Sequence, residues 1–305
     1  MKKAKFVLSF VAIAFAGICT MTSCSKQQLT DQPATLETME GLSKNALNIS
    51  NENNPYDYCG RIHNEILDYI IKNNPNPTHE EIFNLTQEYL QNQYGLSSNL
   101  TFENANKDFN TTTEFILEAF LQNKSFENLL DSKVIAGVLD TLVAYSNSII
   151  KENKLPFPQT YANYIKKQEN MILEMRNEAG ISPDEVSEYD VALGAFAIAR
   201  YSYSYWYDVA KNPENPWNKI NMNFKRQDDN DPKPGFWKRL WDGVCEVVTE
   251  VAEVVVKVAV TPIVDVVGFA WEGMIPNDNP RTFGPKFDFV AGIHGAGDWS
   301  AEVWY

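Results

Sequence analysis

Histidine is the first residue type to examine for chemistry, because it titrates near neutral pH and can act as acid, base or metal ligand. The chain has three. His294 and Asp298 share a glycine-rich stretch, Gly292–Asp298, and on a loop such a pair could transfer protons in a hydrolase. No HExxH, CxxC, Walker A or GxSxG pattern accompanies them. We therefore predict no catalytic residue, with a hydrolase using His294 and Asp298 as an alternative.

The other candidate ligands favour no metal or cofactor. His63 falls among apolar residues of a predicted helix, which indicates a packed histidine, and His79 falls in an exposed first turn. The acidic run 228–231 begins like a calcium loop, but Pro232 takes the fifth position and the sixth is not glycine. We predict a solvated turn there.

The amino terminus has the order of a signal peptide. Lys2, Lys3 and Lys5 precede an apolar run, Phe6–Ile18, whose helical length of about 20 Å falls short of the roughly 30 Å hydrocarbon core of a bilayer. This run is typical of a cleaved export signal. It ends in Met21-Thr22-Ser23-Cys24.

Residues 21–24 resemble the lipobox of bacterial lipoproteins, in which the cysteine is lipidated and becomes the new amino terminus. The resemblance implies a signal peptide over 1–23, lipid (diacylglycerol and palmitate) on Cys24 and a place in the cell envelope. Ser25 after the cysteine implies the outer membrane. Lipobox, asparagine-rich composition and helical layout together resemble uncharacterised helical surface lipoproteins of Bacteroidetes, a likeness that carries over no functional residue.

Charge limits the partners. The net charge is −14, and loss of the three lysines in 1–23 moves it to −17. Nucleic acid is excluded as a partner because phosphate binding needs clustered basic residues. We expect contact with the membrane through the lipid, and an envelope protein or a glycan as partner. Cys59 and Cys245 remain after cleavage, either as a disulfide or as two small buried side chains.

Asn-Pro pairs divide the chain, because the residue before proline is pushed out of the helical region. The predicted organisation is a flexible tether over 24–54, a helical bundle over 55–211, a linker over 212–235, a long amphipathic helix over 236–275 and a loop-rich tail over 276–305. Within the bundle we expect helices over 56–72, 78–93, 111–123, 129–152, 160–179 and from 183 to about 207, three of them opened by capping boxes at Thr78, Thr111 and Ser182.

Two apolar segments dominate the predicted core. Val191–Ala199 is apolar on every side, so we expect it at the centre of the bundle. In 236–275 the charged residues occupy one arc of a helix, and Pro262 should end or kink it near Thr261. This helix either docks on the bundle or acts on a target membrane, the second as part of a secreted antagonistic effector. The tail is expected to be loop, with a strand over 302–305.

An aromatic run follows the central helix. Its rings face different sides, so they either pack in the core or form a surface for a glycan or protein. The candidate surface residues are Tyr201, Tyr205, Trp206, Trp217, Trp237 and Trp241. The sequence thus predicts an all-α, irregular multi-helix bundle with a long carboxy-terminal helix, carried as a non-catalytic, lipid-anchored envelope protein.

Overall fold

A computed structural model describes residues 49–105, 112, 116, 119–122, 124–128, 132–178, 188–218, 253–274 and 287–304. The described part is all-α, as predicted, with 81% of its residues helical and no strand. Several predictions lie outside the described residues. These are the signal peptide, Cys24 and the tether up to residue 48, the helix starts at Thr111 and Ser182, the acidic run 228–231, most of the linker, Trp237, Trp241, Cys245 and residues 236–252.

The first two helices of the bundle follow the sequence pattern closely. Helix α3 (Asp57–Asn73) buries its apolar stripe, with Cys59 fully enclosed as a free thiol. Helix α4 (His79–Tyr94) begins with the predicted capping box: Glu81 N donates to Thr78 Oγ1 at 3.2 Å, and Thr78 N donates to Glu81 Oε2 at 2.7 Å. It ends at Gly95, whose φ of 66° is left-handed, a conformation that glycine adopts without strain.

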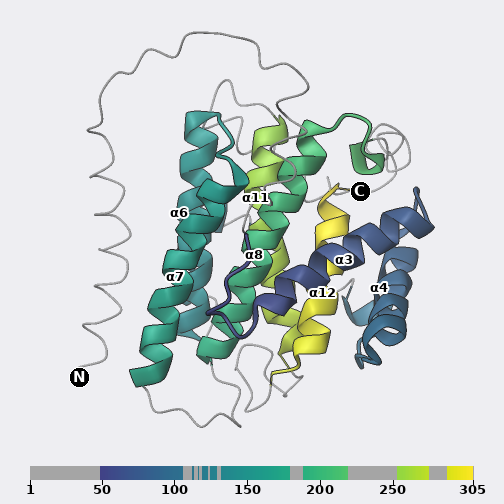
Figure 1. Cartoon of the computed structure of the whole chain (residues 1–305), viewed down its shortest axis with the longest axis horizontal. Coiled ribbons are helices and arrows are strands. Elements are labelled where there is room, and N and C mark those ends of the chain that lie inside the picture. Colours follow the sequence, from purple (N-terminus) through teal and green to yellow (C-terminus); the bar gives the residue numbers. More distant parts are fainter. Residues whose placement is uncertain are drawn as a thin grey trace. The chain divides into compact units, whose positions relative to one another are not determined.

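Four long helices run alongside one another in Figure 1 and form the body of the fold. They are α6 (Lys133–Glu152), α7 (Pro158–Glu178), α8 (Glu188–Lys211) and α11 (Glu253–Gly273); a short 3₁₀ turn, η1 (Phe126–Asn128), precedes α6. Helix α8 packs against α3, α6, α7 and α11, and every residue from Asp190 to Arg200 is buried. The predicted central position of Val191–Ala199 is confirmed.

Helix α11 continues to Gly273, within the predicted range 236–275, so Pro262 lies inside the helix and does not end it. The amphipathic character predicted for this segment is wrong for its second half, because all residues from Val255 to Ala270 are buried. Neighbouring carbonyls find side-chain donors: Thr261 Oγ1 donates to Lys257 O at 2.7 Å, and Ser146 Oγ of α6 donates to Ala259 O at 2.6 Å. Bonds of this kind, together with close packing, let a helix tolerate an internal proline.

The predicted loop and strand in the tail are wrong for residues 289–304, which form helix α12 (Phe289–Trp304). Asp288 opens it, with Oδ1 accepting from the amides of Val290 and Ala291 at 2.9 and 3.1 Å. Three glycines make this segment a poor helix in isolation, since each loses backbone entropy on folding. Packing on α11 outweighs that cost: a Cβ at Gly292 would lie only 2.8 Å from Phe269 O.

By length and composition, two of the described helices are apolar enough to cross a membrane: α6 and α11. Over the stretch tested, 56% of α6 and 89% of α11 is buried in the fold. A buried core helix of a water-soluble bundle meets the same criterion of length and composition. Residues Ile49–Tyr305 group as one compact unit, in which α11 lies inside the bundle.

Candidate functional site

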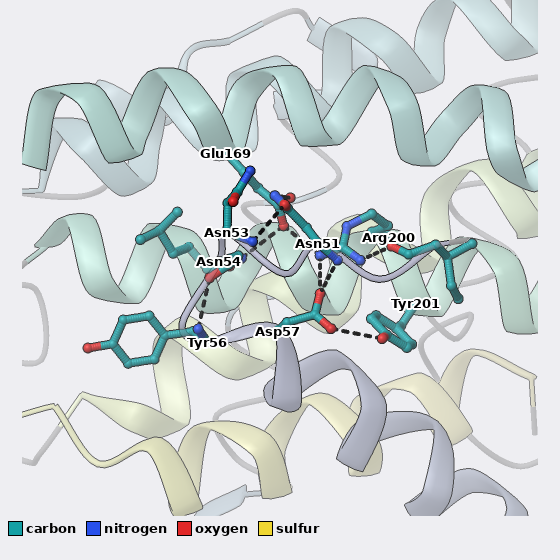
Figure 2. Close-up of polar contacts among 10 residues, drawn as sticks. Asn51, Asn53, Asn54, Tyr56, Asp57, Glu169, Arg200 and Tyr201 are labelled. Atoms are coloured by element: carbon teal, nitrogen blue, oxygen red, sulfur yellow. Dashed lines mark hydrogen bonds and ion pairs between the residues drawn. The ribbon is translucent and has the colours of Figure 1, made fainter. Parts of the chain in front are cut away.

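A buried polar junction lies where the chain enters the fold ahead of α3 (Figure 2). At its centre is Glu169 of α7, fully buried, which accepts from three side chains. Asn51 Nδ2 donates to Oε2 at 2.6 Å, while Asn54 Nδ2 and Arg200 Nη2 donate to Oε1 at 2.9 and 2.8 Å. We call Asn51, Asn54, Asp57, Glu169 and Arg200 the Glu169 junction.

Arg200 holds the junction together from α8. Its Nη2 donates to Asp57 Oδ1 at 2.6 Å, and its Nη1 donates to the carbonyl of Ile49. Burial alone would lower the pKa of the guanidinium, but Glu169 and Asp57 outweigh burial and raise it. Tyr201 donates its hydroxyl to Asp57 Oδ2 at 2.9 Å, and burial together with that carboxylate raises the pKa of Tyr201 to about 12.

The arrangement of the junction is suited to holding segments of the chain together and not to catalysis. Both oxygens of Glu169 are occupied and neither its side chain nor that of Arg200 is exposed, so a substrate has no access to the ion pair. Charges removed from water in this way remain favourable only while their partners are present. The junction therefore fixes residues 49–57 to α7 and α8.

A second buried network contains the residue types of a hydrolase in a different geometry. His63 Nε2 of α3 lies 3.2 Å from Asp265 Oδ2 of α11, and Ser300 Oγ of α12 donates to the same oxygen at 3.0 Å. In a nucleophilic triad the serine bonds to the histidine, whereas here it bonds to the carboxylate. His63, Asp265 and Ser300 are all 0% exposed. The network joins helices in the core and presents no nucleophile.

His294 and Asp298 are also inside the fold. The prediction that they lie on a loop is wrong: both belong to α12, at 0% and 5% exposure. The His294 ring lies 4.5 Å from the Phe83 ring of α4. Within the described residues, no group of three His, Cys, Asp or Glu side chains is placed to hold a metal ion.

The structure also corrects the predicted aromatic surface. Trp206 and Trp217 are fully buried, 5.5 Å apart and edge to face, so they belong to the core and not to a surface. Trp217 Nε1 donates to Tyr205 Oη at 2.9 Å, and Tyr205 donates to Asp68 at 3.1 Å, which ties the segment after α8 to α3. Tyr201 and Tyr205 stay half-buried. Tyr201, Tyr205 and Trp206 donate to partners that lie 144, 137 and 94 residues away in sequence, whereas the partner of Trp217 is 12 residues away.

A different polar aromatic surface lies on α3 and α4, and sequence reasoning missed it. Glu65 accepts from Tyr89 Oη at 3.0 Å, Tyr94 Oη at 2.5 Å and Arg61 Nη1 at 3.0 Å. The Tyr89 ring lies 5.1 Å from Tyr69 and 6.1 Å from Tyr94. We call these five residues the Glu65 face. All are half-buried except Arg61, which is exposed.

Some signals for these sites were present in the sequence. Arg200 is the first charged residue after a nine-residue apolar run, and a charge in such a place needs a buried partner. The partner, Glu169, is 31 residues away, and pattern alone does not identify it.

Searches of protein-family models, of curated proteins and of solved structures each found no match.

Proposed function

We propose that the protein is a lipid-anchored component of the cell envelope, placed in the outer membrane through Cys24, whose helical body binds a partner without catalysis. The lipobox at residues 21–24 carries the proposal. The Glu169 junction supports it, because an anchored body needs a firm attachment where the connecting segment meets the fold. That attachment is made at Ile49, Asn51 and Asn54 by buried side chains of α7 and α8.

The Glu65 face is the surface we propose for the partner, a glycan or another envelope component. Half-exposed tyrosine rings offer flat apolar faces, and the hydroxyls of Tyr89 and Tyr94 are held in place by Glu65. Arg61, with 52% of its side chain exposed, adds donors at the edge. Preorganised aromatic residues with polar groups beside them are typical of surfaces that recognise sugars and proteins.

The anchor is tested by the intact mass of the protein from the producing cell. The expected product begins at Cys24 and carries a diacylglycerol and an acyl chain, and Cys24→Ala moves the protein to the soluble fraction. A soluble wild-type product that begins at Met1, or is trimmed elsewhere, would end the proposal.

Binding is tested by affinity capture from the native envelope with paired variants. Tyr69→Ala with Tyr89→Ala removes two rings of the Glu65 face. Phe157→Ala removes a ring that is 70% exposed and precedes α7 instead. We expect the first variant to capture at least tenfold less partner than the wild type, and the second variant to capture as much as the wild type. Equal capture by both would exclude this face.

A further inference from the structure

Helices α11 and α12 form a hairpin that has the dimensions of a membrane insert. Helix α11 has 21 residues, or about 31 Å of helix, against a hydrocarbon core of roughly 30 Å. Helix α12 has 16 residues, about 24 Å, a mismatch that local bilayer thinning accommodates. Both are enclosed in the bundle, and they pack against each other more extensively than any other pair of described helices.

The contact between the two helices is of the type that also works in lipid. A Cβ on Gly268 would lie 2.8 Å from Gly295 O, and one on Gly292 would lie 2.8 Å from Phe269 O, so the backbones approach closely. Helix pairs in membranes depend on such small residues, since no hydrophobic effect drives association there. The α11–α12 contact therefore does not need water around it.

Part of the polarity of the hairpin is satisfied within the hairpin itself. Ser300 Oγ donates to Asp265 Oδ2 at 3.0 Å, Trp304 Nε1 donates to Thr261 Oγ1 at 2.9 Å, and Thr261 Oγ1 donates to Lys257 O at 2.7 Å. All three bonds stay within α11 and α12. Polar groups inside a bilayer need internal partners of this kind, because lipid offers none.

The charged positions are mostly compatible with insertion. Glu253, Lys257 and Glu272 lie near the two ends of α11, where long side chains can reach the interface, and Asp265 alone is central. On α12, burial lowers the pKa of His294 and raises that of Asp298, which favours the uncharged form of both, and Glu302 lies near the carboxyl end of the helix. The hairpin thus carries few charges that lipid would face.

Several polar bonds hold the hairpin to the rest of the bundle, and insertion would have to break them. Among the described residues they include the His63–Asp265 contact at 3.2 Å, the Trp206 Nε1 donation to Ser300 Oγ at 2.9 Å and the Ser146 Oγ donation to Ala259 O at 2.6 Å. The other contacts that the hairpin makes with α3, α4, α6 and α8 are largely apolar. In a bilayer, contacts with lipid chains would take the place of these apolar contacts.

From these contacts we infer that the α11–α12 hairpin leaves the bundle and inserts into a lipid bilayer as one unit. This activity goes beyond the proposed function: the lipid anchor and the Glu65 face neither require it nor supply its evidence. The expected target is a zwitterionic membrane, because the strong net negative charge opposes approach to anionic lipid.

The structure offers a lock for the test. A Cβ placed on Gly297 of α12 would lie 3.5 Å from Ile66 Cβ of α3, within the Cβ separation of disulfides, about 3.5–4.5 Å. Ile66→Cys with Gly297→Cys should therefore fasten the hairpin to the bundle when oxidised. The background is the chain from residue 24 with Cys24→Ser, Cys59→Ala and Cys245→Ala, so that no other thiol remains after signal cleavage.

The measurement is dye release from phosphatidylcholine vesicles by micromolar protein, with the same double-cysteine variant compared oxidised and reduced. The two single-cysteine variants serve as controls for the oxidant, and helicity by circular dichroism confirms that each variant is folded. We expect release by the background protein and the reduced variant, and at least tenfold slower release by the oxidised variant. Equal release in the two redox states, or no release by the background protein, would overturn the inference. Neither result bears on the mass of Cys24.

Discussion

Arg200 and Glu169 form an ion pair, Nη2 to Oε1 at 2.8 Å, in which neither side chain is exposed. The pair joins α8 to α7, and the asparagines that complete it come from the segment ahead of α3. Because its charges are withdrawn from water, the pair stabilises the fold only as a complete set. One residue can therefore test the whole junction.

Glu169→Ala should lower the free energy of unfolding by about 3–5 kcal/mol, because it leaves Arg200 buried beside only one carboxylate. Urea denaturation measures this change. Glu174→Ala, an exposed position on the same helix, is the matched control and should change stability by less than about 0.5 kcal/mol. A loss near zero for Glu169→Ala would show that water reaches the junction.

Two glycines in helices should respond to alanine in opposite directions. A Cβ on Gly60 of α3 would lie 2.4 Å from Ala197 O of α8, a backbone atom that cannot move away cheaply. We expect Gly60→Ala to destabilise the fold by about 1–3 kcal/mol or more. A Cβ on Gly137 of α6 meets nothing within 4 Å, so Gly137→Ala should stabilise by about 0.5–1 kcal/mol.

Thermal unfolding of both glycine variants gives the comparison directly. Since the two substitutions add the same methyl group to a helix, the difference between them isolates the close approach of α3 and α8. Similar melting temperatures would mean that the two helices are not packed this tightly.

The Glu65 face should depend on pH in a direction set by its carboxylate. Burial alone would raise the pKa of Glu65, but bonds from Tyr94, Tyr89 and Arg61 outweigh it and lower the pKa below the ordinary 4.5. A lowered folded-state pKa means that the stabilising contribution is present above about pH 4.5 and is lost as the pH falls through the folded value.

Comparison with Glu65→Gln measures that contribution. The stability advantage of the wild type should be constant near neutral pH and shrink as the pH falls below 4.5. In the Tyr89→Phe, Tyr94→Phe background the advantage near neutral pH should be smaller, because two of the three donors that lower the pKa of Glu65 are gone and only Arg61 remains. An advantage that grows on acidification would contradict the assigned bonds.

The sequence predicts a helix well when the helix is stabilised by its own residues, and poorly when it is stabilised by packing on another helix. Helix α4 is specified locally, by the capping box between Thr78 and Glu81 and by Gly95, and its predicted ends agree within one residue of the structure. Helix α12 is specified by its neighbour. Its glycines weaken it in isolation, and the reason for them, contact with the α11 backbone, is absent from the sequence pattern.

The same division applies to the sites. For the aromatic run in the second half of α8, the sequence leaves core packing and a binding surface as alternatives. Pattern alone cannot show that Trp206 stacks on Trp304 and donates to Ser300, which is 94 residues away. Likewise, the Glu65 face combines a carboxylate of α3 with tyrosines of α4. The spacing of residues within one helix does not show which residues of another helix lie beside them. Local chemistry was predictable, and pairing between distant elements was not.

The indole of Trp206 provides the last prediction, because it makes two separable contacts with α12. Its ring stacks on Trp304 at 4.3 Å with planes 3° apart, and its Nε1 donates to Ser300 Oγ at 2.9 Å. Trp206→Phe keeps an aromatic ring but removes the donor and leaves a space beside the smaller ring, so it should cost about 1–3 kcal/mol. Trp217→Phe is the matched control, since it removes the donation to Tyr205 Oη and leaves the hairpin contacts intact.

Amide hydrogen exchange distinguishes the two variants beyond their stability. If the Trp206–Ser300 bond holds α12 against α8, Trp206→Phe should speed exchange in residues 289–304 selectively, while Trp217→Phe should leave those residues as slow as in the wild type. Exchange that rises equally along α3, α8 and α12 in both variants would mean that the bond supports the fold as a whole. In that case the hairpin does not open separately from the rest of the bundle.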